Sequence, residues 1–146
     1  MIIAVASGKG GTGKTTVATS LALSIGGQAP GFLDCDVEEP NAALFLKPVL
    51  TQLEQVGILV PEIDWGKCTF CGQCAQVCVW HAIAVVGRKV LIFPGLCHGC
   101  GSCTLSCPEV AIHEVLHPMG TLESGAAGQI AFGHGVLNPG EAMAVP

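Results

Sequence analysis

Two stretches of the sequence carry the same pattern of cysteines. Residues 68–78 read CTFCGQCAQVC, and residues 97–107 read CHGCGSCTLSC. Both have the spacing C-x-x-C-x-x-C-x-x-x-C, and the offset from Cys68 to Cys97 is 29 residues. Gly72 and Gly101 occupy matching places in the two copies. A repeat of this kind indicates a duplicated half-domain.

The clustering of the cysteines favours metal binding. Eight of the nine cysteines fall in the two runs, whereas a disulfide framework spreads its cysteines along a chain. The main alternative is a pair of structural zinc sites, because paired C-x-x-C motifs also bind zinc. A third cysteine at the same step has no use in a four-coordinate zinc site, so the spacing favours iron–sulfur clusters.

The second run ends in Cys107-Pro108 and resembles the run of the bacterial two-cluster ferredoxins. In that pattern the fourth cysteine of each run binds the other cluster. The resemblance implies two [4Fe-4S] clusters, one on Cys68, Cys71, Cys74 and Cys107, the other on Cys97, Cys100, Cys103 and Cys78.

Other residues near the runs have packing interpretations. Trp65 and Trp80 flank the first run, and we expect them to shield it from water. Cys35 lies away from both runs and is expected to be a buried structural thiol. The histidines have no tight ligand spacing and are expected at the surface or in packing roles: His81, His98, His113, His117 and His134.

A second motif lies at the start of the chain. Residues 8–15 read GKGGTGKT and satisfy the phosphate-loop pattern G-x-x-x-x-G-K-[ST]. Residues 2–6, IIAVA, predict a buried parallel strand before the loop. Lys14 is expected to reach the outer phosphates and Thr15 to bind Mg²⁺, while backbone N–H groups hold the phosphates.

A helix is predicted after the loop. Val17, Leu21 and Ile25 share one face of it, and Gly26-Gly27 is expected to end it. Further strands are expected within residues 31–36, 56–63 and 128–135, and in the closing residues 141–146. The strand at 31–36 ends in acidic residues, at the edge where open α/β sheets bind ligands.

Lys9 makes the phosphate loop more specific. The string K-G-G-x-G-K-T-T resembles the deviant Walker A loop of the MinD/ParA superfamily of P-loop ATPases, in which the early lysine reaches the nucleotide of a dimer partner. Asp34-Cys35-Asp36 resembles the switch region of that family, and Asn41 also matches a recurrent position. The resemblance implies ATP and Mg²⁺ as cofactors and a homodimer as the complete assembly.

The same resemblance supplies the expected nucleotide site. Catalytic roles are expected for Lys9, Lys14 and Asp36. Nucleotide-binding roles are expected for Gly8, Lys9, Gly10, Gly11, Thr12, Gly13, Lys14, Thr15, Thr16, Asp34 and Asn41.

Residues 34–46, DCDVEEPNAALFL, followed by the cysteine repeat, resemble the MinD-type ATPases with an inserted ferredoxin domain. The expected fold class is α/β, a partial parallel-sheet P-loop domain with an inserted α+β ferredoxin-like domain. The expected domains are residues 1–62, the insert at 63–117, and a return segment at 118–146. Family members continue beyond the GEAMAVP of residues 140–146 into a Walker B strand and a second switch, so the sequence predicts a truncated ATPase half.

Composition argues against nucleic-acid binding and against a membrane span. The net charge is −5 with only six Lys and Arg, so no basic stripe is available for nucleic acid. Residues 68–87 are free of charged side chains, but glycine, glutamine and the cysteines interrupt them, and no membrane span is expected. The N-terminus lacks a secretory signal, so a reducing, cytoplasmic setting is expected.

Three functions fit these observations. The first is nucleotide-gated electron transfer through two clusters to an unknown redox partner. The second is an iron–sulfur cluster carrier resembling the Mrp branch, which delivers clusters to an acceptor protein. The third is a ferredoxin-like module whose nucleotide site binds without hydrolysis.

Overall fold

The computed structural model describes residues 1–8, 11–25 and 29–141, and these form two compact units. The first unit comprises Met1–Gln55 and Gly120–Gly140, and the second comprises Val56–Met119 with Glu141. The domain limits inferred from the sequence, after residues 62 and 117, fall inside β2 (Val49–Ile63) and β5 (Ile112–Ala127). Each of these two long strands begins in one unit and ends in the other.

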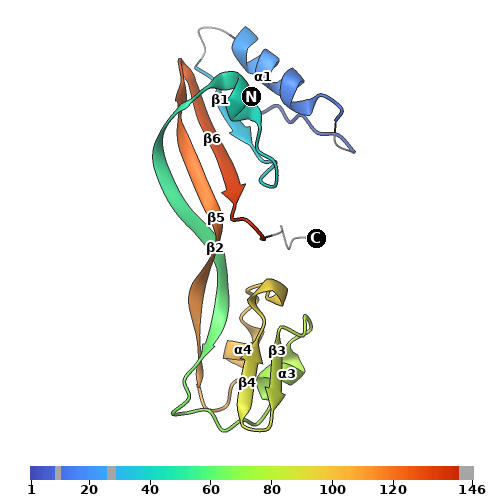
Figure 1. Cartoon of the computed structure of the whole chain (residues 1–146), viewed down its shortest axis with the longest axis vertical. Helices are drawn as coiled ribbons and strands as arrows, with labels where there is room; N and C mark the ends of the chain where they lie inside the picture. Colours follow the sequence, from blue (N-terminus) through green and yellow to red (C-terminus); the bar gives the residue numbers. More distant parts are fainter. Residues whose placement is uncertain (9–10, 26–28, 142–146) are drawn as a thin grey trace. The chain divides into compact units, whose positions relative to one another are not determined.

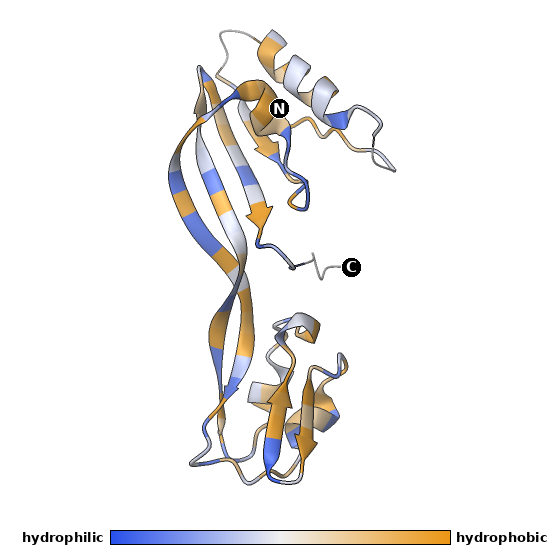
Figure 2. Cartoon of the chain, viewed as in Figure 1, coloured by the Kyte–Doolittle hydropathy of each residue, from blue (hydrophilic) through white to orange (hydrophobic). Residues whose placement is uncertain are grey.

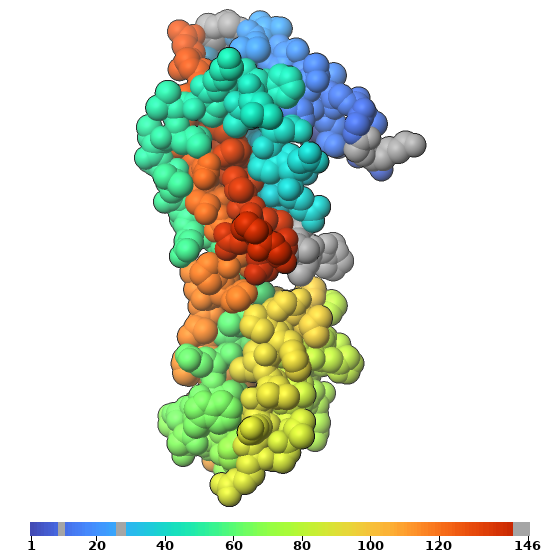
Figure 3. Space-filling view, viewed as in Figure 1, coloured from blue at the N-terminus to red at the C-terminus, as the bar shows by residue number. Residues whose placement is uncertain are grey.

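The first unit contains α1 (Lys14–Ser24), β1 (Gly31–Asp34), α2 (Ala42–Leu46) and β6 (Ile130–Leu137), together with parts of β2 and β5 (Figure 1). The sheet order is β1-β6-β5-β2. β1 pairs in parallel with β6, and their atoms lie side by side in Figure 3 (β1 cyan, β6 red). β5 pairs antiparallel with β6.

The core of the first unit lies between the helices and the parallel pair of strands. Its largest member is Phe132 of β6, whose ring stacks on Phe32 of β1 with centroids 6.0 Å apart. The buried residues of this core are Ala22, Ala42, Leu46, Ile130 and Phe132. One residue of α1 and two of α2 therefore join the sheet through β6.

The buried face of α1 is not the apolar face through Val17 and Leu21. Val17 is 58% exposed and Leu21 37% exposed, whereas Thr19 and Ala22 are buried. The packed face consists of small side chains, which allow α1 to lie close to α2. The Thr19 hydroxyl is satisfied within the helix, since it donates a hydrogen bond to the Thr15 carbonyl over 2.7 Å. The predicted stop at Gly26-Gly27 lies outside the described residues.

Residues 2–6 do not form the predicted strand. Ile2 is 98% exposed and Ile3 is 51% exposed, with no strand assigned to them. A strand needs a neighbour for its backbone hydrogen bonds. Residues 2–6 pair with no strand of the described chain, so the apolar run alone was insufficient to predict one.

The second unit is built round a short hairpin and two helical turns. Its elements are α3 (Gln73–Val77), β3 (Ile83–Val86), β4 (Lys89–Ile92), η1 (Pro94–Leu96) and α4 (Ser102–Leu105), with the remaining parts of β2 and β5. β3 and β4 pair antiparallel, Ile83 opposite Ile92, and both are mainly hydrophobic (orange in Figure 2). Gly87 forms the tight turn between them with φ 59°.

The core of the second unit forms where the hairpin meets the cysteine loops. Its buried members are Ile63, Cys74, Ile83, Val90 and Ile112, and Cys68, Cys103 and Cys107 pack against it half-buried. A backbone hydrogen bond of 2.8 Å from the Asp64 amide to the Ala111 carbonyl joins the end of β2 to the residue before β5. Both cysteine runs are therefore fixed to one core.

The predicted strands at 31–36, 56–63 and 128–135 are confirmed in β1, β2 and β6, although β2 begins earlier, at Val49. The apolar residues 42–46 form α2. Most of the predicted closing strand lies outside the described residues. No helix in the described part of the chain combines the length and apolar character needed to span a bilayer.

Candidate metal centres and nucleotide loop

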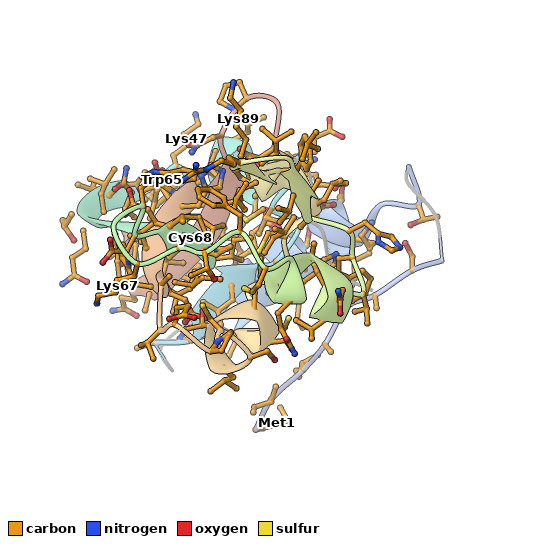
Figure 4. The ribbon with its side chains drawn as sticks, turned by 90° about the horizontal axis from the view of Figure 1, so that it is seen from below. Met1, Lys47, Trp65, Lys67, Cys68 and Lys89 are labelled. Atoms are coloured by element: carbon orange, nitrogen blue, oxygen red, sulfur yellow. The ribbon has the colours of Figure 1, made fainter. Side chains whose placement is uncertain are left out.

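Four cysteines line one hollow of the second unit, which has an empty volume of about 360 Å³. Three of them come from the first run: Cys68, labelled in Figure 4, and Cys71 lie in the loop between β2 and α3, and Cys74 lies on α3. The fourth, Cys107, comes from the end of the second run. Two apolar side chains of the hairpin, Val85 and Val90, also line this hollow.

A second hollow, of about 380 Å³, has the same construction with the runs exchanged. Cys97 and Cys100 lie in the loop between η1 and α4, and Cys103 lies on α4. The fourth, Cys78, comes from the end of the first run. The structure thus brings together the two sets of four cysteines that the sequence predicts as cluster ligands. Their ligand roles remain predictions.

Local backbone geometry explains how each loop turns round its hollow. Gly72 and Gly101 precede α3 and α4 with φ of 81° and 71°, a left-handed conformation that glycine adopts without strain. Each middle cysteine therefore lies just before a sharp turn, and the third cysteine lies on the helix that follows. This geometry gathers the three sulfur atoms of one run at one hollow.

Backbone amides point at the sulfur atoms in both halves. The amide of Ala82 donates to Cys78 Sγ over 3.3 Å, and the amide of Ala111 donates to Cys107 Sγ over 3.3 Å. These two bonds occupy equivalent places in the repeat. The amide of Gly99 adds a bond of 3.5 Å to Cys97 Sγ. Hydrogen bonds of this kind stabilise negative charge on a cluster sulfur.

The donor sets fit iron–sulfur clusters. Every cysteine is a free thiol, and thiolate sulfur is the ligand that [4Fe-4S] clusters use in sets of four. The cysteines line the walls of the hollows, and in the described ranges no three His, Cys, Asp or Glu side chains converge as ligands of a single metal ion do. Clusters bound there would give each hollow a one-electron redox centre.

The thiols of the two loops have unequal acidity. Burial raises the pKa of Cys74 and that of Cys103 above the usual cysteine value. The Ser102 hydroxyl, 3.5 Å from Cys100 Sγ, lowers the pKa of Cys100. The first run has Gln73 in place of Ser102, so only the second loop has a hydroxyl group beside a ligand sulfur at this position.

The two tryptophans lie differently from the prediction. Trp80 lines the second hollow and stacks on His98, with ring centroids 3.7 Å apart. It does not line the hollow of the first three cysteines, because it follows Cys78, which crosses to the other half. Trp65 is 59% exposed and stacks on Phe70, which lines the first hollow. The expected shielding of the first run is therefore wrong for Trp80 and indirect for Trp65.

The histidines have the expected surface and packing roles. His134 is buried and lies 2.9 Å from Glu123. Exposed His113 lies 2.8 Å from Glu62 on the neighbouring long strand. His98 stacks on Trp80, His117 lies 3.7 Å from Glu141, and His81 is exposed.

The phosphate loop lies in the first unit, and α1 begins at its Lys14. Gly11 and Gly13 have φ of 73° and 84°, so the loop uses glycine for conformation, while a Cβ at either place would meet nothing within 4 Å. The Thr12 hydroxyl donates to the Ser7 hydroxyl over 2.7 Å. Lys14 and Thr15 are half-buried at the start of the helix, whereas Gly8 and Thr16 are exposed. Lys9 and Gly10 lie outside the described residues.

Asp34 and Asp36 have different surroundings. Asp34 ends β1, and its carboxylate accepts hydrogen bonds from the Ala42 amide at 3.0 Å and the Asp36 amide at 3.2 Å. It therefore holds the loop that leads to Asn41 and the start of α2. The Asp36 side chain is exposed. Cys35 is exposed as well, so its predicted burial is wrong: the chain leaves the sheet at this point and the thiol faces outward.

Sequence reasoning missed one polar residue of the second hollow and the residue that holds it. Glu114 lines that hollow, and the Thr104 hydroxyl donates a hydrogen bond to its Oε1 over 3.1 Å. The sequence repeat does indicate them. When the two halves are aligned on their cysteines, Glu114 corresponds to Val85 and Thr104 to Ala75. A side-by-side reading of the two halves would have shown the difference.

Two family models match the chain. Residues 1–69 match the ParA model, described as NUBPL iron-transfer P-loop NTPase. Residues 61–83 and 90–113 match the 4Fe-4S binding domain. The chain joins a ParA-type P-loop NTPase segment to a 4Fe-4S ferredoxin domain. The predicted fold class is thereby confirmed, and the match to the 4Fe-4S binding domain favours clusters over the zinc alternative.

Named relatives share this similarity. An uncharacterized protein of Methanocaldococcus jannaschii is 39% identical over 113 residues, covering 73% of this chain and 39% of that protein. A second from the same organism is 39% identical over 101 residues, 68% of this chain and 35% of that protein. An iron–sulfur cluster carrier protein of Synechocystis is 51% identical over 95 residues, 64% of this chain and 24% of that protein. The chain thus spans less than two fifths of each of these relatives.

The comparisons and the site agree on the general chemistry. The ferredoxin domain binds [4Fe-4S] clusters, and the ParA-type segment carries the glycine-rich loop of a nucleotide-binding protein. The cysteine repeat and the glycine-rich loop therefore belong to one iron–sulfur protein.

Proposed function

We propose that this chain is an ATP-binding iron–sulfur protein that transfers electrons through two [4Fe-4S] clusters, with the nucleotide state of its ParA-type segment regulating the transfer. The observation that carries the proposal is the pair of hollows in one small unit, each lined by four cysteines drawn from both runs. Two redox centres held by interleaved loops favour electron passage between them.

The closeness of the two sites supports electron transfer. Cys74 lies on α3 and Cys103 on α4, and these two helices pack against each other. After burial, the neighbouring Cys103 is among the causes that raise the pKa of Cys74, in keeping with two thiols that lie near each other. Because these residues line different hollows, electrons have a short route from one cluster to the next.

Nucleotide binding is proposed for the first unit. Backbone N–H groups of the glycine loop and the N-terminus of α1 favour phosphate, Lys14 adds charge, and Thr15 supplies a hydroxyl for Mg²⁺. For hydrolysis we propose charge stabilisation by Lys9 and Lys14 and water positioning by Asp36. A homodimer would let Lys9 reach the nucleotide of the partner subunit. The free cysteines fit a reducing cytoplasmic setting.

Cluster delivery is the second candidate. Its support is the printed name of the Synechocystis relative and that of an Aquifex aeolicus relative 44% identical over 69 residues, both iron–sulfur cluster carrier proteins. The side chains favour retention instead. In each hollow three of the four cysteines are buried or half-buried, and only Cys71 and Cys100 are exposed.

One experiment separates the two candidates. The protein is reconstituted without oxygen, incubated with an apo-ferredoxin acceptor and repurified, and its cluster absorbance is compared before and after. Electron transfer predicts that the clusters remain and are reduced by dithionite and reoxidised reversibly. Loss of clusters to the acceptor at the same rate with and without dithionite would contradict the proposal and support the carrier function.

The role of nucleotide has its own test. The redox titration is repeated with Mg-ATP, with Mg-ADP and without nucleotide. We expect the midpoint potential of at least one cluster to move between these states. Identical potentials together with measurable ATP binding would instead leave a ferredoxin-like module whose nucleotide site has no redox role.

A further inference from the structure

The two hollows differ at one pair of positions that the repeat makes equivalent. Val85 of β3 lines the first hollow, and Glu114 of β5 lines the second. A second pair of equivalent positions also changes from apolar to polar: Ala75 of the first half corresponds to Thr104 of the second. An apolar pair in one half is thus replaced by a hydrogen-bonded polar pair in the other.

The carboxylate of Glu114 is held beside the second cysteine loop. The Thr104 hydroxyl donates to its Oε1 over 3.1 Å. A Cβ built on Gly101 would lie 3.0 Å from the same oxygen, so the carboxylate nearly touches the turn between Cys100 and Cys103. The Glu114 side chain is exposed, and its hydrogen bond keeps a negative charge on the wall of this hollow.

The first hollow has a carboxylate of its own, but it is held differently. Glu109 follows Cys107-Pro108, lines the first hollow and is exposed. Within the described residues no hydrogen bond or ion pair fixes it. Both carboxylates are exposed, so water screens both, and the difference is that a hydrogen bond from Thr104 keeps Glu114 beside the second cysteine loop whereas Glu109 moves more freely.

We propose that Glu114 makes the two cluster sites electronically unequal, by lowering the reduction potential of the cluster held by Cys97, Cys100, Cys103 and Cys78. This inference rests on the proposed function. Reduction adds one electron to a cluster, and a nearby fixed negative charge disfavours that electron. Glu114 acts through its charge beside the hollow, where the hydrogen bond from Thr104 holds it, so it is a tuning residue without a ligand role.

The test is a redox titration of the reconstituted full chain, followed by electron paramagnetic resonance. Wild type is compared with Glu114→Gln, which keeps an acceptor for Thr104 and removes the charge. The inference predicts that one of the two reduction waves moves to more positive potential while the other stays in place. Glu109→Gln is the matched control, and its shift should be clearly smaller.

A reciprocal variant shows which reduction wave belongs to which hollow. Val85→Glu places a carboxylate in the first hollow at the equivalent position, so the wave that Glu114→Gln leaves unmoved should now move to more negative potential. Should Val85→Glu fail to take up clusters, Glu114→Val copies the first hollow into the second and should shift the same wave as Glu114→Gln, by at least as much.

Three results would overturn the inference. They are unmoved waves in Glu114→Gln, equal movement of both waves, and a shift in Glu109→Gln as large as that in Glu114→Gln. These outcomes leave the proposed function intact if wild type still shows two reversible waves. A wild-type protein with no cluster signal would overturn both.

Discussion

The indole ring of Trp80 stacks on the imidazole of His98, with ring centroids 3.7 Å apart and planes inclined by 19°. The two residues come from different halves of the repeat. Trp80 lies two positions after Cys78 and His98 lies next to Cys97, so the stack joins the two chain segments that form the second hollow.

Replacing Trp80 with alanine should destabilise the second hollow more than the first. Aromatic pairs contribute about 0.5–1.5 kcal/mol beyond the area they bury, so we expect the free energy of unfolding to fall by at least about that amount. The cluster in the second hollow should also bleach faster in air. Trp65→Ala is the control, since Trp65 lines neither hollow and should leave the bleaching rate unchanged.

The fourth cysteine of each run should be needed for the cluster that the first three cysteines of the other run bind. We expect Cys107→Ser to perturb or remove the cluster of the first three cysteines, and Cys78→Ser to do the same to the other. Iron analysis and paramagnetic resonance measure both effects. Cys35→Ser should change neither, because this thiol is exposed and lies in the first unit. If Cys107→Ser affected only the cluster of its own run, the crossed assignment would be wrong.

Removing the charge of Lys14 should weaken nucleotide binding. A charge-assisted contact to phosphate is among the strong hydrogen bonds, so Lys14→Ala should reduce ATP affinity about tenfold or more, measured by calorimetry. Thr15→Ala should reduce the dependence of that affinity on Mg²⁺. Lys47→Gln is the matched control, because Lys47 is an exposed lysine of the same unit beyond α2. Equal loss in Lys14→Ala and Lys47→Gln would argue against the phosphate loop.

Substitutions of Asp34 and Asp36 should differ in their effect on the stability of the protein. Asp34 accepts two backbone hydrogen bonds near the start of α2, so Asp34→Ala should lower the free energy of unfolding of apoprotein by about 1–2 kcal/mol in thermal or denaturant melts. Asp36 is exposed, and Asp36→Ala should cost less than about 0.5 kcal/mol. A larger loss in Asp36→Ala than in Asp34→Ala would contradict the structural role of Asp34.

The cysteine sites could be predicted because their determinants are local. Three cysteines and a glycine within seven residues fix a tight loop, and the repeat supplies the partner for the fourth position. The Glu114–Thr104 hydrogen bond is different, because it joins β5 to α4, ten residues earlier, and leaves no motif. Only comparison of the two halves, Glu114 against Val85, points to it.

The errors in the first unit come from tertiary partners that a local pattern does not contain. Residues 2–6 have the composition of a buried strand, but no strand of the described chain pairs with them. The apolar face through Val17 and Leu21 satisfies helical periodicity, yet α1 packs through Thr19 and Ala22. Cys35 was assigned to the interior by its apolar neighbours, whereas the strand ends one residue before it.

The measurement that tests the central claim most directly is the iron, sulfide and zinc content of anaerobically prepared protein, combined with its Mössbauer spectrum. Two four-iron clusters predict about eight iron and eight sulfide per chain, with the spectrum of [4Fe-4S] centres that dithionite reduces. A colourless protein that holds zinc, or iron without sulfide, would contradict the account.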